Sequence, residues 1–511
     1  MRPDSLTLAE LTDLLGGTLL NSTVPGPVIR SVVSSGDHQQ PESIFVAYKG
    51  VTADGHEYID QAFANGAVAA VVTDASRLGE RPGILAQDGQ RALSRLCAAF
   101  AGDPSKELLT VGITGTNGKT TIHWLLYHAL GRLGLPAIRI GSLGIAAEGR
   151  VERSGKVTTR NAGRIVLTTP AACEIHESLC LALEQGVKAC VLETSSHALD
   201  QRRVSDVWYD VAVFTNLTTD HLDYHHDMEA YFQTKVGLFR QLTAQRAETV
   251  GERGGAVVNT DCPYGRRLID IVREMGLPTV TFGEDRSAKV RIVAFDQGFE
   301  HSTLTLELEG ERYEIGTNLT GDYNASNMAA AFAALVSLEF EPQEAAAALS
   351  EIPSVPGRLE SVGTPDIAVL VDYAHTGEGL RNLLSALRGF VENDLWVVFG
   401  CGGGKDPRKR EGMGRAAKEL ADRIVLTSDN PKNEDPAKII EDILASGCEP
   451  ELIELDRGRA IEQTLRKAQK GDVVVLVGKG HEDYQIIGNQ TFYFSDREEA
   501  LKWREQGLLD R

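Results

Sequence analysis

A glycine-rich run that ends in a lysine and two threonines has the clearest chemical capacity in this sequence. The run is Gly112-Ile113-Thr114-Gly115-Thr116-Asn117-Gly118-Lys119-Thr120-Thr121. It stands between an apolar stretch, 108–111, that predicts a buried strand and a segment, 123–130, that predicts a helix. A turn of this kind points backbone N–H groups and a helix N-terminus at one phosphate. We expect Lys119 to reach the outer phosphates of ATP and the Thr120 hydroxyl to bind Mg²⁺.

The run differs from the usual phosphate loop at one place. Ile113 stands where that pattern has its first glycine, and an ordinary strand-to-helix turn is the alternative interpretation. The Gly-Lys-Thr ending and the two flanking elements favour the nucleotide site.

Polar or glycine residues also follow nearly all of the remaining predicted strands. In open parallel sheets, ligands bind at the carboxyl ends of the strands. We therefore expect two sheets to present these residues to one cleft between domains. The segments are 193–197, 215–217 with 220–221, 372–375, 400–403, 427–431 and 478–482.

Four residues of these segments, and one outside them, have candidate roles that follow from their own surroundings. Glu193 follows a buried strand, which favours a Mg²⁺ ligand over an ion-paired surface carboxylate. His221 suits metal or phosphate, although a lone histidine is more often structural. Asp372 and His375 end a strand and suit contacts to ribose or phosphate. Arg358 lies just past a second linker, from which it would reach across to phosphate.

Other candidate residues are predicted, from their neighbours in the sequence, to lie at the surface without a specific role. Lys235 reads as a solvated helix lysine, and His225 and His226 as loop surface. The basic run Arg408-Lys409-Arg410 is interpreted as a solvated charge run. Lys405 lies closer to the glycine-rich turn 400–403 and is the better candidate for a ligand-binding residue.

Composition narrows the class of protein. The 511 residues suit three domains, and 42% hydrophobic with 24% charged residues are typical of a globular chain. A net charge of −20 argues against a nucleic-acid backbone as main partner, so an anionic substrate needs local lysines and arginines. No apolar run is long enough for a membrane span, and Met1 to Ser5 is no signal peptide.

Cysteine usage and length add expectations about the compartment. The seven cysteines show no paired metal spacing, and several lie in apolar segments. We expect them to be reduced core residues rather than disulfides. A cytoplasmic protein follows from these features together.

The chain predicts an α/β fold with three domains. Residues 1–106 form a small N-terminal α/β domain, with strands at 43–47 and 67–72. Residues 107–349 form a central domain with a mostly parallel sheet and helices, ending in an Ala-rich helix, 327–338. Residues 350–511 form a C-terminal Rossmann-like α/β domain, whose strands are 368–371, 396–399, 423–426 and 473–477.

Across nearly its whole length the chain closely resembles the Mur ligases, and among them the MurE type. The segments that carry the resemblance are 115–121, 168–170, 193–197, 214–223, 323–324, 357–360, 372–376, 429–431 and 478–485. The resemblance implies an ATP-dependent ligase of peptidoglycan precursor synthesis. It adds an amino acid to UDP-N-acetylmuramoyl-L-alanyl-D-glutamate through an acyl phosphate, while Mg²⁺ and Lys119 neutralise charge on the transferring phosphoryl group.

The resemblance also assigns roles to residues that match family positions. The catalytic residues are Lys119, Glu193, His221 and Lys235. Mg²⁺ is held by Thr120 and Glu193, with His221 nearby, and a second Mg²⁺ by Lys235 as a carbamate. ATP is bound by Gly115, Thr116, Asn117, Gly118, Lys119, Thr120, Thr121, Asn324, Arg358, Asp372 and His375. The UDP-linked substrate is bound by Ser35, Thr168, Thr169, Ser195, Gln201 and Arg203.

The site for the added amino acid departs from the family pattern. It comprises Lys405, Asp429, Asn430, Pro431, Lys432, Gly478 and Glu482. Members that add diaminopimelate carry arginines where this chain has Lys405 and Lys432. Lysine keeps the charge but loses the bidentate fork. Two retained cations favour meso-2,6-diaminopimelate, while L-lysine, another amino acid, or a paralogue outside cell-wall synthesis stay open.

The N-terminal segment also departs from the family pattern. Ser34-Ser35-Gly36-Asp37 replaces the family Asp-Ser-Arg at the uridine end, whereas Asp54-Gly55 matches. A folylpolyglutamate synthetase and a non-catalytic nucleotide-binding protein are the competing functions. The expected partners are a UDP-N-acetylmuramoyl dipeptide and a free diamino acid, and the expected state is a monomer that closes over a nucleotide between two domains.

Overall fold

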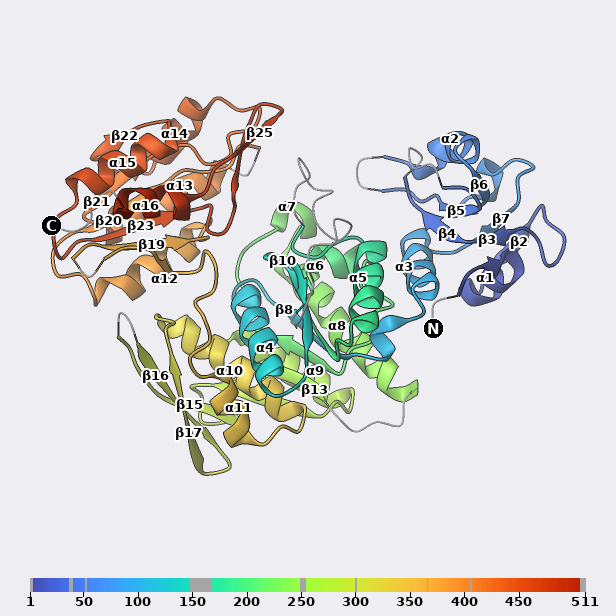
Figure 1. The fold of residues 1–511 in the computed structure, drawn as a ribbon, viewed down its shortest axis with the longest axis horizontal. Coiled ribbons are helices and arrows are strands. Elements are labelled where there is room, and N and C mark those ends of the chain that lie inside the picture. The colour runs from blue at the N-terminus through green and yellow to red at the C-terminus, as the bar shows by residue number, and fades with distance from the viewer. Residues whose placement is uncertain are drawn as a thin grey trace.

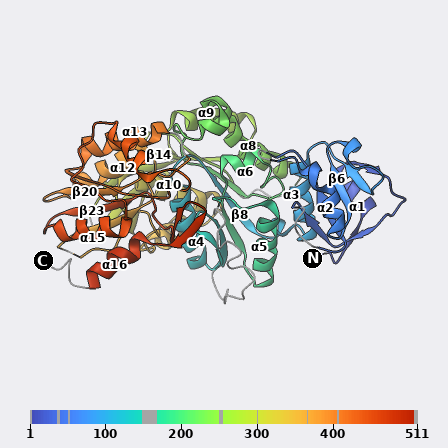
Figure 2. The ribbon, with the colours of Figure 1, turned by 90° about the horizontal axis from the view of Figure 1, so that it is seen from above.

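Three α/β lobes follow one another along the molecule in the computed structural model (Figures 1 and 2). The structure describes residues 3–35, 40–50, 53–147, 167–248, 254–298, 301–364, 366–404 and 407–505. The N-terminal and C-terminal lobes lie on opposite sides of the central one (Figure 1). Within these described ranges no helix is both long and apolar enough to cross a membrane. The α/β fold class is confirmed.

The N-terminal lobe holds a five-stranded sheet in the order β2-β7-β6-β5-β4, parallel except at β2. Helix α1 begins with a capping box, in which Thr7 and Glu10 satisfy each other's backbone N–H groups. A separate pair joins β1 and β3. The strands are β1 (Leu6–Thr7), β2 (Thr18–Leu20), β3 (Val28–Ile29), β4 (Ser31–Val33), β5 (Ser43–Val46), β6 (Ala67–Val72) and β7 (Gly83–Leu85). The helices are α1 (Leu8–Leu15), α2 (Ile59–Ala64), α3 (Gly89–Phe100) and the 3-10 turns η1 (Gly55–Tyr58), η2 (Ala75–Arg77) and η3 (Pro104–Lys106).

The central lobe is built on a ten-stranded sheet in the order β10-β9-β11-β8-β12-β13-β14-β15-β16-β17. The strands from β9 to β15 run parallel, and β10, β16 and β17 add antiparallel edges. Continuous apolar runs suit the parallel strands because helices cover both faces, whereas β16 alternates buried and half-buried residues. The strands are β8 (Leu109–Thr114), β9 (Ala137–Gly141), β10 (Gly144–Ala147), β11 (Ala189–Glu193), β12 (Val211–Phe214), β13 (Gly255–Asn259), β14 (Thr279–Gly283), β15 (Val290–Asp296), β16 (Ser302–Leu308) and β17 (Glu311–Thr317).

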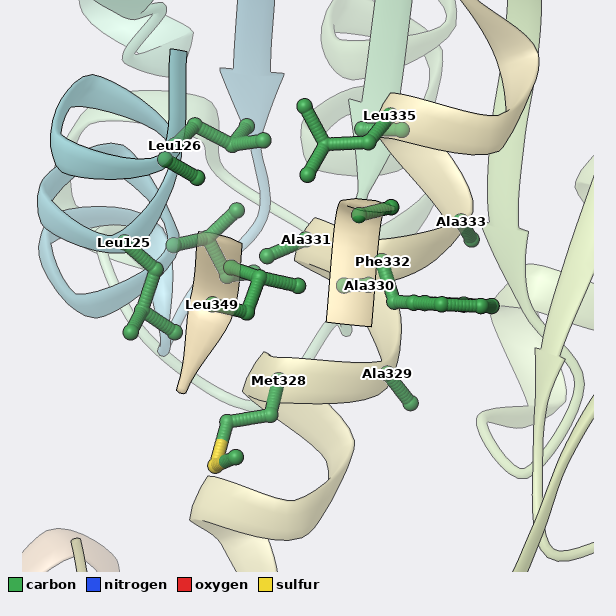
Figure 3. Packing of buried hydrophobic residues seen from close by; sticks show 14 of the residues in the cluster. Leu125, Leu126, Met328, Ala329, Ala330, Ala331, Phe332, Ala333, Leu335 and Leu349 are labelled. Carbon is green, nitrogen blue, oxygen red and sulfur yellow. The ribbon is translucent and has the colours of Figure 1, made fainter. Parts of the chain in front are cut away.

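An Ala-rich helix fills the core on one side of this sheet. The small side chains of Ala329, Ala330 and Ala331 let the helix lie close to its neighbours, and Figure 3 shows Leu125 and Leu349 packed beside it. The helices of the lobe are α4 (Lys119–Arg132), α5 (Ala172–Glu184), α6 (Ser196–Asp200), α7 (Leu222–His225), α8 (Met228–Glu248), α9 (Pro263–Glu274), α10 (Asp322–Ser337) and α11 (Pro342–Leu349).

The C-terminal lobe holds a six-stranded sheet in the order β18-β19-β23-β20-β21-β22, parallel except at β18. A hairpin of β24 and β25 extends from it. The strands are β18 (Glu360–Ser361), β19 (Ala368–Asp372), β20 (Leu395–Phe399), β21 (Arg423–Leu426), β22 (Leu452–Ile453), β23 (Val473–Val477), β24 (Tyr484–Ile487) and β25 (Gln490–Tyr493). The helices are α12 (Gly377–Arg388), α13 (Pro407–Leu420), α14 (Pro436–Leu444), α15 (Arg457–Lys467) and α16 (Asp496–Glu505).

The cysteine prediction is wrong for one pair. Cys97 of α3 and Cys173 of α5 form a disulfide with their Cα atoms 4.8 Å apart. The other five cysteines are free and buried, as expected. The pair is 76 residues apart in sequence, so no local spacing signals it, and only the packing of α3 on α5 brings the two thiols together.

One turn along α5 from Cys173, His176 is buried, and neither ring nitrogen has a hydrogen-bond partner among the described residues. Burial lowers the pKa of His176 from 6.5 to about 4. The unfolded chain therefore takes up a proton first as pH falls below 6.5. The stability that this residue contributes is complete above that pH and is lost as pH falls towards 4.

We expect His176→Leu to make the folded state less sensitive to acid. Between pH 7.5 and pH 5.0 the wild type should lose about 2 kcal/mol of unfolding free energy more than the variant. Urea unfolding at the two pH values measures this difference. His226→Leu is the control because that side chain is exposed. Equal losses in the wild type and His176→Leu would contradict the assignment.

Candidate functional site

The glycine-rich loop joins the end of β8 to the start of α4 and packs tightly against its neighbours. Gly115 and Gly118 have φ of +149° and +88°. A Cβ atom at Gly115 would collide with the Thr215 side chain, and one at Gly118 with that of Asn327. The Thr215 hydroxyl donates to the Asn117 carbonyl at 2.6 Å. Glycine is therefore required at both positions, and the loop forms a fixed cradle of the kind that phosphate binding needs.

Lys119 and Thr120 lie at the first turn of α4. The Lys119 ammonium donates to the carbonyls of Gly115 and Thr116, at 2.9 Å each, and so curls back over the loop. Thr120 Oγ1 donates to Glu193 Oε2 at 3.2 Å. Thr121 is buried beside them. The residues predicted to hold the outer phosphates and Mg²⁺ are thus in contact.

Glu193 ends β11 with its side chain fully buried. Its carboxylate accepts hydrogen bonds from the Ser142 N–H at 2.9 Å and from the Ser142 hydroxyl at 3.1 Å. Burial raises the pKa of Glu193, and the nearby Lys119 partly offsets that rise. A buried carboxylate beside a threonine hydroxyl is a site that gains stability from a bound cation.

The described residues fit Mg²⁺ only together with a nucleotide. Among them, no group of three or more His, Cys, Asp or Glu side chains could hold a metal ion. Thr120 and Glu193 supply two oxygens, and Mg²⁺ takes its remaining ligands from substrate phosphates and water in sites of this type.

Lys235 of α8 is not a solvated helix lysine, and that interpretation is wrong. The side chain is 1% exposed, donates to the Gly115 carbonyl at 2.9 Å and lies 4.6 Å from the Tyr231 ring centre. Burial, together with the charge of Lys119, lowers its pKa well below the usual range. Two lysines therefore share one carbonyl oxygen, that of Gly115, beneath the loop. Nothing in the sequence of α8 itself indicates what packs over this position.

A cluster of rings surrounds His221 near the end of β12. Its ring is half-buried, lies 3.4 Å from an Asp220 carboxylate oxygen and contacts the His197 ring at 4.8 Å between centres. Partial desolvation lowers the pKa of His221 to about 4. His225 is buried with Nε2 2.9 Å from the Ser196 hydroxyl, so the expectation of loop surface is wrong for it. His226 is exposed, as expected.

The C-terminal lobe brings further residues to the same loop. Arg358 stacks 4.6 Å from the Tyr373 ring centre and places Nη2 3.5 Å from Thr120 Oγ1. Asp372, at the end of β19, accepts from the Leu359 and Ala374 N–H groups at 2.9 and 2.8 Å.

Two further contacts join the lobes. His481 Nε2 lies 3.0 Å from the Ser142 carbonyl oxygen, and Lys409 donates to Asp220 at 2.8 Å. The lobes therefore meet around the glycine-rich loop.

The two remaining residues predicted to bind ATP, Asn324 and His375, lie on different lobes. Asn324 is buried in the first turn of α10 and donates to the Thr320 carbonyl at 2.8 Å, next to Asn327, which faces the loop. His375 is exposed, with Nδ1 3.1 Å from the Tyr373 carbonyl oxygen.

Five of the residues predicted to hold the UDP-linked substrate gather around the end of β11. The Thr169 hydroxyl lies 2.7 Å from the Glu193 carbonyl oxygen and 3.0 Å from the Ser195 hydroxyl. Arg203 donates to the Thr169 carbonyl. Thr168 accepts from Ser142 at 3.3 Å, and Gln201 donates to Tyr224 at 3.3 Å. Ser35 follows β4 in the N-terminal lobe, and its neighbours Gly36 and Asp37 lie outside the described residues.

The predicted amino-acid pocket forms where the loops after β21 and β23 meet. Asn430 donates to Glu482 at 2.9 Å, and a Cβ atom at Gly478 would press on the Asp429 carboxylate. Burial, and then the charge of Asp429, raise the pKa of Glu482. Pro431 is buried beside them. Two facing carboxylates suit an incoming ammonium group.

Lys432 lies at the rim of this pocket in a left-handed conformation, φ +54°. Its N–H donates to the Ile486 carbonyl at 3.0 Å, and its own carbonyl accepts from the Gly488 N–H at 2.8 Å. The hairpin of β24 and β25 thus fixes the backbone of Lys432. The second predicted cation, Lys405, lies outside the described residues.

The prediction of a solvated charge run at 408–410, in the first half of α13, is wrong for Lys409 and Arg410, whereas Arg408 is exposed as expected. Arg410 is 2% exposed and pairs with Glu434 at 2.7 Å and with Asp442 at 2.8 Å, and Lys409 pairs with Asp220 across the lobes. Sequence reasoning also missed Lys479, which is fully buried with Nζ 3.5 Å from Asn430 Oδ1. Their partners are distant in sequence, so a local pattern cannot find them.

The fold and this arrangement match those of known ligases. Residues 113–335 match the Mur ligase middle domain, and residues 357–480 match the Mur ligase, glutamate ligase domain. The chain is 40% identical, over 99% of both chains, to the UDP-N-acetylmuramoyl-L-alanyl-D-glutamate--2,6-diaminopimelate ligase of Thermosynechococcus vestitus. It is 40% identical, over 90% of this chain and 91% of the relative, to the enzyme of the same name from Geobacter metallireducens.

A solved structure of a UDP-N-acetylmuramoyl-L-alanyl-D-glutamate--2,6-diaminopimelate ligase superposes with a TM-score of 0.69 at 28% identity, covering 99% of each chain. The chain belongs to the Mur ligase family. It is a ligase, as the sequence predicts, and the match includes the N-terminal residues, which argues against a folylpolyglutamate synthetase.

Proposed function

We propose that this ligase uses ATP to join meso-2,6-diaminopimelate to UDP-N-acetylmuramoyl-L-alanyl-D-glutamate in peptidoglycan precursor synthesis. One observation carries the proposal. Glu193 contacts Thr120 of the glycine-rich loop through its carboxylate and Thr169 of the predicted substrate group through its carbonyl. A phosphoryl donor held by the loop would therefore lie beside a carboxylate held at the end of β11.

The reaction proceeds in two steps in this proposal. The substrate carboxylate attacks the γ-phosphorus of ATP, ADP leaves, and an acyl phosphate forms. The amino group then attacks the carbonyl carbon, the bond to the phosphate oxygen breaks, and phosphate and a proton are released. Lys119 offsets the charge that the phosphoryl oxygens carry in the first step.

Mg²⁺ held by Thr120 and Glu193 would supply positive charge opposite the phosphates. Lys235 is suited to carbamylation because its lowered pKa favours the neutral amine, the form that adds CO2. A carbamate on Lys235 would replace one of the two neighbouring positive charges with a negative one and so relieve the repulsion between the two lysines. It would also present oxygens to a second Mg²⁺.

Diaminopimelate fits the charges at the third-substrate pocket. The molecule carries two ammonium groups and two carboxylates. Asp429 and Glu482 suit an ammonium group, and Lys432 at the rim suits the carboxylate that L-lysine and L-ornithine lack. The relatives named above carry diaminopimelate in their names.

Lys432→Ala is expected to raise the KM for diaminopimelate by about 10- to 100-fold, because a charge-assisted contact is lost. The KM for ATP should stay within about twofold of the wild-type value. Initial rates of phosphate release measure both constants. Lys438→Ala, an exposed lysine of α14 in the same lobe, is the control. An unchanged KM for diaminopimelate would remove Lys432 from the pocket.

Phosphate release with ATP, Mg²⁺ and the UDP-linked dipeptide tests the proposed function. Release should depend on diaminopimelate and stay near background with L-lysine or L-ornithine. Turnover with one of those two instead would show a changed pocket, and turnover with none would assign a different nucleotide-linked acceptor.

We also propose that the three lobes are domains with bounds 1–106, 107–349 and 350–511. The contacts between Arg358 and Thr120 and between Lys409 and Asp220 support a nucleotide site between the second and third. Because ATP and UDP-linked precursors are cytoplasmic metabolites, the proposal places the reaction in the cytoplasm.

A further inference from the structure

We propose that a fully buried ion pair, Arg457 with Asp496, positions the amino-acid pocket from beneath. This inference rests on the proposed function, because it concerns the pocket for the added amino acid. Arg457 begins α15, and Asp496 begins α16, near the C-terminal end of the described chain. Neither residue is next to a pocket residue in the sequence. Neither belongs to the groups predicted to bind a substrate.

The ion pair is bidentate, which fixes the orientation of the guanidinium group. Arg457 Nε and Nη2 donate to the two Asp496 carboxylate oxygens, at 2.6 Å each. Both side chains are fully buried. A planar guanidinium held at two points by a carboxylate has a fixed orientation, so its remaining N–H groups point in defined directions.

Those remaining N–H groups reach the two strand ends that open into the pocket. Arg457 Nη1 donates to the Ser428 carbonyl at 3.3 Å, and Nη2 also donates to the Val477 carbonyl at 3.0 Å. Ser428 directly precedes Asp429, and Val477 directly precedes Gly478. One side chain therefore contacts the peptide that precedes a pocket residue in each loop, Asp429 in one and Gly478 in the other.

Planarity of the peptide carries this contact into the pocket. Fixing a carbonyl oxygen fixes the plane that contains the next residue's N–H group. The Gly478 N–H, in the plane set by Val477, donates to the Asp372 carbonyl at 3.1 Å. The loops also touch, because a Cβ atom at Gly478 would press on the Asp429 carboxylate. A small rotation at either carbonyl would therefore change how Asp429 faces Glu482.

Charge supports the same assignment. Arg457 interacts favourably with Asp429 and Glu482 as well as with Asp496. Lys479 Nζ also lies 3.6 Å from Glu482 Oε2, so two buried cations compensate the negative charge of the pocket. Of these two cations, Arg457 is the one that donates to the backbone of both pocket loops.

A second buried carboxylate offers a matched control for a merely structural role. Asp472 is 2% exposed and accepts hydrogen bonds from Asn393, Asp394, Trp396 and Gln469. It directly precedes β23, at the amino end of the same sheet, whereas Arg457 reaches the carboxyl end. Loss of either network should destabilise the lobe, but only loss of Arg457 should alter the pocket.

The test compares Arg457→Lys, Asp472→Asn and the double variant Arg457→Met with Asp496→Leu, by steady-state phosphate release and thermal unfolding. The double variant removes both buried charges together, a change that buried ion pairs often tolerate, so it keeps the test valid where Arg457→Lys fails to fold. We expect both Arg457 variants to raise the KM for diaminopimelate by about tenfold or more. The KM for ATP should change by less than about twofold. Asp472→Asn should lower Tm without shifting either KM.

An unchanged KM for diaminopimelate in the folded Arg457 variants, or equal shifts of all KM values in them and in Asp472→Asn, would overturn the inference. Absence of diaminopimelate-dependent turnover in the wild type would instead overturn the proposed function.

Discussion

Lys119→Ala is expected to lower kcat by about 10³-fold or more, a larger effect than that of Lys235→Ala. The Lys119 ammonium lies within the glycine-rich loop, where it donates to Gly115 and Thr116. In the proposed reaction it turns to the phosphoryl oxygens, whose charge it offsets during transfer. Lys119 is the only lysine or arginine in the run 112–121.

Rapid-quench measurement of ADP formation in a single turnover measures this loss independently of product release. Lys188→Ala is the control, since Lys188 is an exposed lysine at the amino end of β11, opposite the end that carries Glu193. Thermal unfolding should show both variants folded. A Lys119→Ala protein that keeps more than about a tenth of the wild-type kcat would exclude this lysine from phosphoryl transfer.

Lys235→Ala is expected to lower kcat by about 10²-fold or more, because it removes the amine on which the proposed carbamate would form. Lys235→Glu, which brings a carboxylate to the same place, should retain more activity than Lys235→Ala. The lysine is buried and its pKa is lowered mainly by burial, which increases the fraction of the neutral amine, the form that adds CO2.

The carbamate has a direct readout besides activity. Wild-type protein in ¹³C-bicarbonate should give a carbamate carbonyl signal in the NMR spectrum, which disappears on acidification and is absent from Lys235→Ala. A wild-type spectrum without that signal, together with full activity in CO2-depleted buffer, would show that Lys235 acts as an unmodified amine.

Much of the fold was predictable because the signals are local. Apolar runs such as 473–477 form buried parallel strands, and the Gly-Lys-Thr ending marks the start of α4. The polar residues after each strand lie at the carboxyl edges of two sheets, and Arg358 does contact Thr120 across the lobes. Contacts of this kind follow from the topology of parallel sheets.

The wrong interpretations share one physical cause. Local sequence predicts surface positions for Lys235 as a solvated helix lysine, for Arg410 as part of a solvated charge run, and for His225 as loop surface. Each is instead buried and contacts a residue at least 24 positions away in sequence. The disulfide of Cys97 with Cys173 depends on the packing of α3 against α5 in the same way. Local patterns report which residues a helix presents, but only tertiary packing decides what covers them.

Mass spectrometry of one reaction mixture tests the central claim most directly. The UDP-linked dipeptide, labelled with ¹⁸O in its free glutamyl side-chain carboxylate, is incubated with ATP, Mg²⁺ and meso-diaminopimelate. The account predicts inorganic phosphate that carries one ¹⁸O atom and a UDP-linked product heavier by one diaminopimelyl residue. Unlabelled phosphate would contradict the acyl phosphate, and an unchanged dipeptide would contradict the proposed ligation.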